Sequence, residues 1–350
     1  MSKHVNRLRK KIMLGLTKNV GKSAFEKGIN IERNDVKRVL ICRPNHRLGN
    51  MLLITPLVQE VEATFPNCTI DVFVKGGAAI PIFENYTTID KIIRLPKKHF
   101  SQLPQYISRW VGLKTKKYDI AINVNAKSSS GRLSTKAARA DLKFFGDVDK
   151  EFKSKYKDYK HIAKYPVYNF RYFVSKLGIH DTLDAPIPSL NLKLSEQERT
   201  NGKKKLDELV DTTKETICIF TYATGAKCYE TQWWKECYKQ LKANFSEYNI
   251  LEILPVENVS QIDFEAPSFY SKDVREIASV IANSKVFVGA DSGMMHLASA
   301  SQAPTIGLFS CTDTEVYEPY GNRSTSVKVT KPEDVHKCIH AVANVLKQKE

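Results

Sequence analysis

The sequence predicts an α/β protein with two doubly wound parallel sheets, one in each of two successive domains. Apolar, β-branched runs alternate with segments whose apolar residues recur at helical spacing, a pattern typical of parallel strands joined by helices. This alternation begins twice, on either side of residues 181–190, which contain two prolines and show no periodicity. A chain of 350 residues is also long enough to bury two cores.

The composition is that of a globular protein with a strong positive charge. Hydrophobic residues make up 42% of the chain and charged residues 26%, so disorder is not expected. The formal net charge of +16 attracts polyanions of any kind, including anionic lipid and nucleotide phosphates, without choosing among them. Because no nucleic-acid recognition motif accompanies this charge, we expect no specific nucleic-acid partner.

The seven cysteines are scattered and form no Cys-x-x-Cys pair, and the histidines show no metal-ligand spacing. We therefore expect reduced thiols, no structural zinc and no other metal. No apolar run approaches the roughly 20 residues of a membrane span, and no signal peptide is recognisable. These features predict a cytoplasmic location.

Residues 1–34 form a basic N-terminal extension, and the first 22 residues contain seven Lys or Arg and no acidic residue. Apolar residues recur in it at helical spacing: Val5, Leu8, Ile12 and Leu16. One interpretation is an amphipathic helix that holds the protein peripherally on the anionic inner face of the cytoplasmic membrane. The other is a frayed basic terminus or a helix packed on the body, since Gly15 and Gly21 weaken a helix here.

Residues 35–185 are predicted to form the first domain, which opens with a strand at 36–43 and a turn-rich loop at 44–50. The elements that follow are a helix at 51–65, strands at 68–74, 89–95, 119–124 and 142–145, and a helix at 103–113. In a doubly wound sheet, the loop after the first strand opens on the edge where ligands bind. We therefore expect functional residues in the loop at 44–50.

Residues 186–330 are predicted to form the second domain, and residues 331–350 a C-terminal helix with Pro332 near its first turn. The first elements of this domain are a helix at 195–210, a strand at 216–221, a helix at 232–244, a strand at 250–254 and a helix at 274–283. The same alternation predicts a second parallel sheet.

The most informative stretch of the second domain is 285–310. A strand at 286–288 leads through a turn at 289–293 into a helix at 294–301 and a strand at 304–309. Such a turn places the helix N-terminus, with its free N–H groups and positive dipole end, at the carboxyl edge of the sheet, where phosphates bind.

Three residues of this stretch are candidates for ligand contact. Gly293 lets the backbone approach a phosphate oxygen, Asp291 can cap the helix or hold a sugar hydroxyl, and His296 can face the same ligand. The alternative is that residues 291–293 are an ordinary helix N-cap and His296 is structural.

Residues 291–300 read Asp-Ser-Gly-Met-Met-His-Leu-Ala-Ser-Ala, and residues 304–309 read Pro-Thr-Ile-Gly-Leu-Phe. These runs resemble the signature of glycosyltransferase family 9, the heptosyltransferase family, which is Asp-(Thr/Ser)-Gly-x-x-His-x-Ala-Ala followed by Pro and Leu-Phe-Gly. Ser310 stands where the family usually has the last Gly. Residues 38–56, 221–226 with Trp233, and 254–257 are similar to other family segments, so the resemblance covers most of the chain.

The resemblance implies the GT-B fold, in which two facing Rossmann-like domains enclose a cleft, the first binding the acceptor and the second the donor. It implies an inverting glycosyltransferase that moves a sugar from a nucleotide diphosphate donor onto a lipopolysaccharide-type or other saccharide or glycolipid acceptor. The donor that the family usually takes is ADP-heptose, and no metal or other cofactor is expected.

The resemblance also assigns candidate binding residues. Those on the donor side are Thr224, Gly225, Lys227, Glu257, Asp291, Ser292, Gly293 and His296. Lys227 can supply the charge that the family usually draws from a Lys at the position of Thr231, and the Glu257 carboxylate can accept hydrogen bonds from ribose hydroxyls. On the acceptor side we assign Arg43 and Arg47.

The chain departs from the family pattern at Asn50, where the family has the acidic residue thought to be the general base. An amide cannot accept a proton near neutral pH, so Asn50 can orient the acceptor hydroxyl but cannot deprotonate it. His46, in the same loop, is the nearest titratable substitute. The alternative is that His46 is only a solvated loop residue, and that the chain is a non-catalytic nucleotide-sugar-binding protein that has lost its base.

Overall fold

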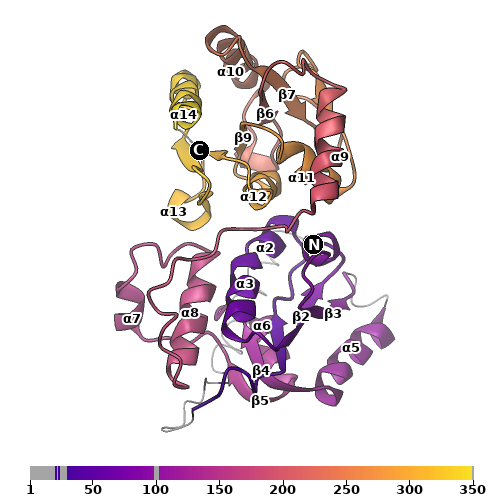
Figure 1. Cartoon of the computed structure of the whole chain (residues 1–350), viewed down its shortest axis with the longest axis vertical. Helices are drawn as coiled ribbons and strands as arrows, with labels where there is room; N and C mark the ends of the chain where they lie inside the picture. The colour runs from indigo at the N-terminus through magenta and orange to yellow at the C-terminus, as the bar shows by residue number, and fades with distance from the viewer. Residues whose placement is uncertain (1–19, 22, 24–29, 98–101, 349–350) are drawn as a thin grey trace. The chain divides into compact units, whose positions relative to one another are not determined.

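The computed structural model describes residues 20, 21, 23, 30–97 and 102–348 (Figure 1). The chain divides into two compact units between Pro188 and Ser189, three residues after the boundary expected from the sequence. The predicted amphipathic helix in the first 22 residues falls almost entirely outside the described residues.

Unit 1 contains a five-stranded, fully parallel sheet in the order β3-β2-β1-β4-β5. Its strands are β1 (Arg38–Cys42), β2 (Thr69–Lys75), β3 (Ile89–Leu95), β4 (Lys117–Asn123) and β5 (Arg139–Phe144). The strand order reverses between β1 and β4, because the chain proceeds from β1 towards one edge and from β4 towards the other. The first predicted doubly wound sheet is therefore confirmed.

Helices cover both faces of this sheet. They are α2 (Leu48–Leu52), α3 (Thr55–Thr64), α4 (Ala79–Phe83), α5 (Leu103–Thr115), α6 (Ser129–Ala137), α7 (Lys150–Ser154) and α8 (Lys164–Ser175). Helix α3 packs beside α8, whereas α5 packs beside α6 (Figure 1).

The single helix predicted at 51–65 is wrong, because the structure has two helices, α2 and α3, in this stretch. Pro56 lies in the first turn of α3 and has no N–H to continue the hydrogen-bond ladder of α2. The Thr55 hydroxyl instead donates to the Leu52 carbonyl over 2.8 Å and closes the turn between the helices. Asn50 consequently lies inside α2 rather than in a loop.

Unit 2 contains a six-stranded parallel sheet in the order β11-β10-β9-β6-β7-β8. Its strands are β6 (Thr216–Phe220), β7 (Asn249–Ile253), β8 (Ser268–Phe269), β9 (Val286–Ala290), β10 (Thr305–Phe309) and β11 (Thr325–Lys328). The strand order reverses between β6 and β9. The second predicted sheet is confirmed, with β9 extending two residues beyond its predicted end.

The helices of unit 2 are α9 (Glu196–Asp207), α10 (Thr231–Asn244), α11 (Val274–Ile281), α12 (Gly293–Ala300), α13 (Thr314–Tyr317) and α14 (Val335–Lys347). Two 3₁₀ turns, η1 (Gly225–Lys227) and η2 (Pro332–Asp334), precede α10 and α14. Helices α10 and α14 pack together, whereas α9 packs on α11, and α11 on α12 (Figure 1). The C-terminal helix α14 contributes Cys338 and Val342 to the core of unit 2.

A glycine in β10 sets how closely α12 lies on the sheet. A Cβ atom at Gly307 would come within 2.6 Å of the Met295 Sδ atom, which belongs to α12. A side chain at this position would displace Met295, so Gly307 lets the side chains of α12 pack closely on β10. The N-terminus of α12 is thereby fixed at the carboxyl end of β9.

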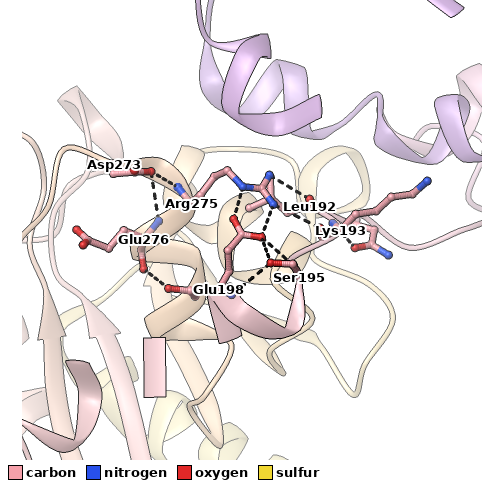
Figure 2. Close-up of polar contacts among 9 residues, drawn as sticks. Leu192, Lys193, Ser195, Glu198, Asp273, Arg275 and Glu276 are labelled. Carbon is pink, nitrogen blue, oxygen red and sulfur yellow. Dashed lines mark hydrogen bonds and ion pairs between the residues drawn. The ribbon is translucent and has the colours of Figure 1, made fainter. Parts of the chain in front are cut away.

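A buried arginine holds the polypeptide on each side of the division between the units. In unit 1, Arg171 donates to both Glu60 carboxylate oxygens and to the carbonyls of Ala185 and Pro186. In unit 2, Arg275 pairs with Glu198 and donates to the carbonyls of residues 192 and 193 (Figure 2). Each arginine therefore ties the end of its own unit to a helix of that unit.

Glu198 links the Arg275 contacts to the start of α9. Its carboxylate accepts from the N–H of Ser195, while the Ser195 hydroxyl accepts from the N–H of Glu198, which together form a capping box (Figure 2). Burial alone raises the pKa of Glu198, but the hydrogen bonds from Arg275 and Ser195 outweigh it and lower that pKa to about 2. The carboxylate is therefore charged at neutral pH, as the ion pair requires.

Candidate functional site

Three loops meet at the carboxyl edge of the sheet in unit 2, after β6, β9 and β10. These strands are parallel neighbours, so their carboxyl ends lie side by side. The strand order reverses between β6 and β9, and open α/β sheets bind ligands in the crevice outside such a reversal. This edge is therefore where a ligand site is expected.

Each of the three loops contributes one side chain to a polar cluster around Asp291. Lys227 Nζ donates to Asp291 Oδ2 over 2.5 Å, and Thr312 Oγ1 donates to the same oxygen over 2.6 Å. Lys227 Nζ also lies 5.6 Å from the centroid of the Tyr317 ring. The Asp291 side chain is 4% exposed and that of Lys227 is 34% exposed, so a ligand can reach the ammonium group while the carboxylate stays fixed.

The helix N-cap of α12 is Ser292, which corrects the prediction that Asp291 can cap this helix. The Ser292 side chain accepts from the N–H of Met295 over 3.3 Å, whereas the Asp291 carboxylate accepts from Lys227. Gly293 is the first residue of α12, is half-buried and does not have a positive φ. Because its backbone conformation does not demand glycine, close approach of a ligand remains the hypothesis for this position.

The loop after β6 is exposed and is joined to the loop after β10. Thr224 is exposed, and Gly225 has a φ of +65°, a conformation that favours glycine. Ser310 Oγ donates to the Ala226 carbonyl over 3.4 Å. The side chain at the position where the family usually has Gly therefore connects two of the three loops.

Two further donor residues predicted from the sequence are Glu257 and His296. Glu257 is exposed in the turn that follows β7, four residues beyond Ile253, and no hydrogen bond or ion pair joins its side chain to the described residues. His296 is buried within α12, where its backbone N–H donates to the Ser292 carbonyl. The structure therefore does not place Glu257 beside Asp291 and Lys227.

A different glutamate, which the sequence analysis missed, is buried between β6 and the loop after β7. Glu252 accepts from Thr221 Oγ1 over 2.6 Å and from Ser260 Oγ over 2.7 Å. Burial raises the pKa of this carboxyl group, and the two hydrogen bonds oppose that rise. Glu252 thus holds the loop that carries Glu257 against the end of β6.

The loop after β1 in unit 1 is ordered by amide side chains. Arg43 Nη2 donates to Asn50 Oδ1 over 3.3 Å, and Asn50 Nδ2 donates to Asn45 Oδ1 over 3.3 Å. Asn45 Oδ1 also accepts from the N–H of Arg47 over 3.0 Å. The structure therefore brings Arg43 and Asn50 together, and Asn50 uses its amide both as donor and as acceptor.

His46 and Arg47 are exposed at the tip of this loop. Partial loss of hydration lowers the pKa of His46, and the positive charges of Lys75, Lys97 and Arg47 lower it further, because they disfavour the imidazolium. The imidazole is therefore neutral, and able to accept a proton, down to a lower pH than an unperturbed histidine. No such basicity is available from the Asn50 amide.

Thr312 and Tyr317 of the Asp291 cluster were also missed by the sequence analysis. Thr312 lies three residues beyond β10, so the rule that ligands bind after the strands next to a reversal was the signal that could have found it. Tyr317 belongs to α13, a four-residue helix that is too short to show helical periodicity in the sequence. Among the described residues, no helix is long and apolar enough to cross a membrane, and no three His, Cys, Asp or Glu side chains cluster as metal ligands would.

Comparison with known proteins finds a family match that covers the loops after β9 and β10. The model of glycosyltransferase family 9 (heptosyltransferase) matches residues 272–345, which contain α11, β9, α12, β10 and most of α14. Lipopolysaccharide heptosyltransferase 3 of Escherichia coli is 20% identical over 289 residues, which cover 78% of this chain and 84% of that protein. The resemblance to family 9 is therefore confirmed.

Solved structures agree with this result at the level of the fold. A family 9 glycosyltransferase from Veillonella parvula DSM 2008 has a TM-score of 0.69 at 16% identity, covering 91% of this chain and 99% of that one. The E. coli heptosyltransferase WaaC with ADP has a TM-score of 0.62 at 17% identity, covering 87% and 99%. These structures confirm the predicted GT-B fold class, and the family model and the E. coli relative bear out the expectation of a glycosyltransferase.

Proposed function

We propose that this chain moves a sugar from a nucleotide diphosphate donor onto a saccharide acceptor with inversion at the anomeric carbon. The observation that carries the proposal is the pairing of Lys227 with the buried Asp291 beside the N-terminus of α12, at the reversal of strand order. ADP-heptose is the donor we favour and a lipopolysaccharide-type saccharide the acceptor, since one solved relative contains ADP and another protein similar to this chain is a lipopolysaccharide heptosyltransferase.

On the donor side, the diphosphate would bind at the N-terminus of α12, where Gly293 keeps the backbone N–H groups accessible. Lys227 can contact a phosphate oxygen while it stays paired with Asp291, because an ammonium group has three donors and a third of this side chain is exposed. As the bond from the sugar to the phosphate breaks, negative charge accumulates on the departing diphosphate. The ammonium group and the helix N-terminus stabilise that charge.

On the acceptor side, a neutral imidazole of His46 would take the proton of the acceptor hydroxyl. The hydroxyl oxygen then forms its bond to the anomeric carbon from the side opposite to the departing diphosphate, which accounts for inversion. Asn50 would orient the acceptor through its amide, and Arg43 and Arg47 would bind acidic groups of a phosphorylated or carboxylated saccharide.

The test is release of nucleoside diphosphate that depends on both donor and acceptor. A thermal-shift panel of nucleotide diphosphates and nucleotide sugars selects the donor, since a ligand at 100 times its dissociation constant adds about 2.7 kcal/mol of stability. The selected donor is then incubated with acceptor saccharides. Acceptor-dependent release of diphosphate supports the proposal, and donor hydrolysis that no acceptor accelerates contradicts it.

A second function is favoured by the position of Asn50. Its amide donates to Asn45 and accepts from Arg43, so the residue at the position of the family's base is built into the loop as an amide. A chain that binds the nucleotide sugar without transferring it fits this observation. It predicts tight donor binding in the thermal-shift panel and no diphosphate release with any acceptor tested.

A further inference from the structure

Helix α5 presents a line of apolar side chains to solvent. Leu103, Ile107 and Val111 follow one another at four-residue spacing, so they lie along one face of the helix. Their exposed fractions are 49%, 51% and 53%. We call these three residues the α5 stripe. An exposed apolar line of this length marks an interaction surface, whereas scattered single apolar residues do not.

The stripe is separate from the side of α5 that packs on unit 1. Leu113 is fully buried, and Tyr106 and Trp110 pack against the same core cluster. The Trp110 ring meets the Phe73 ring edge-on, with centroids 5.6 Å apart. Helix α5 is therefore held in place by one side, and the stripe is not needed for that packing.

A shallow apolar groove lies beside the stripe. It has a volume of about 400 Å³ and is lined by Tyr106, Ile107, Trp110, Val111, Lys114 and Ala137. Ala137 is the last residue of α6, so the groove runs between α5 and the end of α6.

The charge around the stripe is positive. Neither α5 nor α6 contains an acidic residue. Arg109, Lys114 and Lys136 lie on these two helices, and no carboxylate of the described residues pairs with any of them. The next lysines along the chain are neutralised, because Lys116 pairs with two aspartates and Lys117 with a third. The surface thus combines an apolar line with unpaired cations.

We propose that the α5 stripe, with Lys114 and Lys136, docks on an anionic lipid bilayer. The apolar side chains enter the boundary between headgroups and acyl chains, and the two lysines contact lipid phosphates, as in interfacial amphipathic helices. An acidic protein would supply carboxylates for the lysines. It would not bury the apolar side chains that are exposed on three consecutive turns of the helix. A second copy of this basic chain would bring like charges together at the stripe.

The position of α5 after β3 suggests what membrane docking would do for the acceptor. Helix α5 follows β3, and the carboxyl end of β3 lies on the same edge as that of β1, which precedes Arg43 and His46. The N-terminal end of the stripe is therefore nearer to this edge. If the proposed function holds, a lipid-borne acceptor would be presented to the unit that carries the acceptor loop, although docking itself needs neither substrate.

The first test is sedimentation of the full chain with vesicles of phosphatidylcholine containing about a quarter phosphatidylglycerol, without donor or acceptor. Ile107→Glu and Val111→Glu should each weaken binding about tenfold, because a carboxylate replaces an inserted side chain. Lys114→Ala should weaken it about fivefold, which corresponds to the roughly 1 kcal/mol expected per basic residue. The matched control is Ile80→Glu, which alters a 43%-exposed isoleucine on α4 of the same unit and should bind as the parent does.

The second test uses Trp110 as a local reporter. Brominated acyl chains in the same vesicles should quench tryptophan emission, and Trp110→Phe should abolish the quenching because Trp233 and Trp234 are both more than 90% buried. Equal loss of binding in Ile80→Glu and Ile107→Glu would overturn the proposal, as would quenching that survives in Trp110→Phe. A lipid-free dimer that Ile107→Glu dissociates would show that a second copy covers the stripe instead. Transfer to a soluble acceptor is assayed separately, so failure of docking and failure of the proposed function are distinguishable.

Discussion

The two units place their candidate residues at equivalent points of similar sheets but use different chemistry there. In unit 1 the loop follows β1, next to the reversal between β1 and β4, and in unit 2 the loops follow β6 and β9 at the corresponding reversal. The loop of unit 1 is ordered by the neutral amides of Asn45 and Asn50. The loops of unit 2 are ordered by the charged pair of Lys227 and Asp291.

The difference follows from what each site is proposed to bind. A diphosphate is a fixed anion, and Lys227, which is partly exposed, can contact it while it stays paired with the buried Asp291 carboxylate. A proton acceptor must instead be reachable and neutral, and His46 is exposed with a lowered pKa. In the proposed function, the same position in the fold would therefore bind a charged group in one unit and accept a proton in the other.

The largest effect on the rate of transfer is expected from a substitution in unit 1. His46→Ala should reduce the rate of transfer by roughly 10²- to 10⁴-fold, because it removes the proposed base, and should leave donor affinity unchanged. Initial rates of diphosphate release and a donor titration measure the two quantities. Turnover within a few-fold of the parent would remove His46 from the mechanism and reduce the contrast between the two loops.

The next largest effect is expected at the start of α12. Gly293→Val should weaken donor binding by about 100-fold or more, because a branched side chain would occupy the space of a phosphate oxygen. The control is Gly112→Val, at a position in α5 where a Cβ atom has no neighbour within 4 Å. Isothermal titration with the nucleoside diphosphate measures both variants. If the folded Gly293→Val variant binds as the parent does, the phosphate site lies elsewhere.

Lys227→Ala should weaken donor binding by about 10- to 100-fold, as expected for one hydrogen bond to a charged group. It also leaves Asp291 without its cation, so Lys227→Arg, which keeps the charge, should retain most of the affinity. The matched control is Lys235→Ala, which removes a lysine from an exposed pair with Asp263 in the same unit and should change nothing measurable. Equal effects at positions 227 and 235 would argue for general electrostatics.

The pH dependence of kcat/KM should show whether protonation of His46 in unit 1 limits the reaction. Because the pKa of His46 is lowered, its neutral form persists below pH 6.5, and activity should be full above the folded pKa and fall as pH drops through it. The acid limb should therefore have its midpoint below 6.5. His46→Ala should lose this limb, whereas Lys227→Ala should keep it, and an unchanged limb in His46→Ala would assign it to another group.

The sequence predicted unit 2 better than unit 1 for physical reasons. The strand–turn–helix unit around Gly293 is local, so its apolar runs and turn residues indicate both its structure and the edge at which it lies. Asn50 was expected in a loop because the apolar pattern of 51–65 hides the break at Pro56. Thr312 and Glu252 were missed because their partners are distant in the sequence and meet them only in the folded sheet.

The smallest effect is expected from Asn50→Asp, which restores the family's carboxylate. The new charge would strengthen the contact with Arg43, while the hydrogen bond to Asn45 would be lost, since a carboxylate cannot donate. These changes nearly offset each other, so the free energy of unfolding should change by no more than about 1 kcal/mol. If base catalysis operates, the rate should be maintained or raised by a few-fold, and the nearby negative charge should move the acid limb of His46 to higher pH. Denaturant titration and a pH–rate profile measure the three quantities. A large loss of rate with unchanged stability would mean that the amide N–H itself is needed, and that unit 1 no longer uses the chemistry its family position implies.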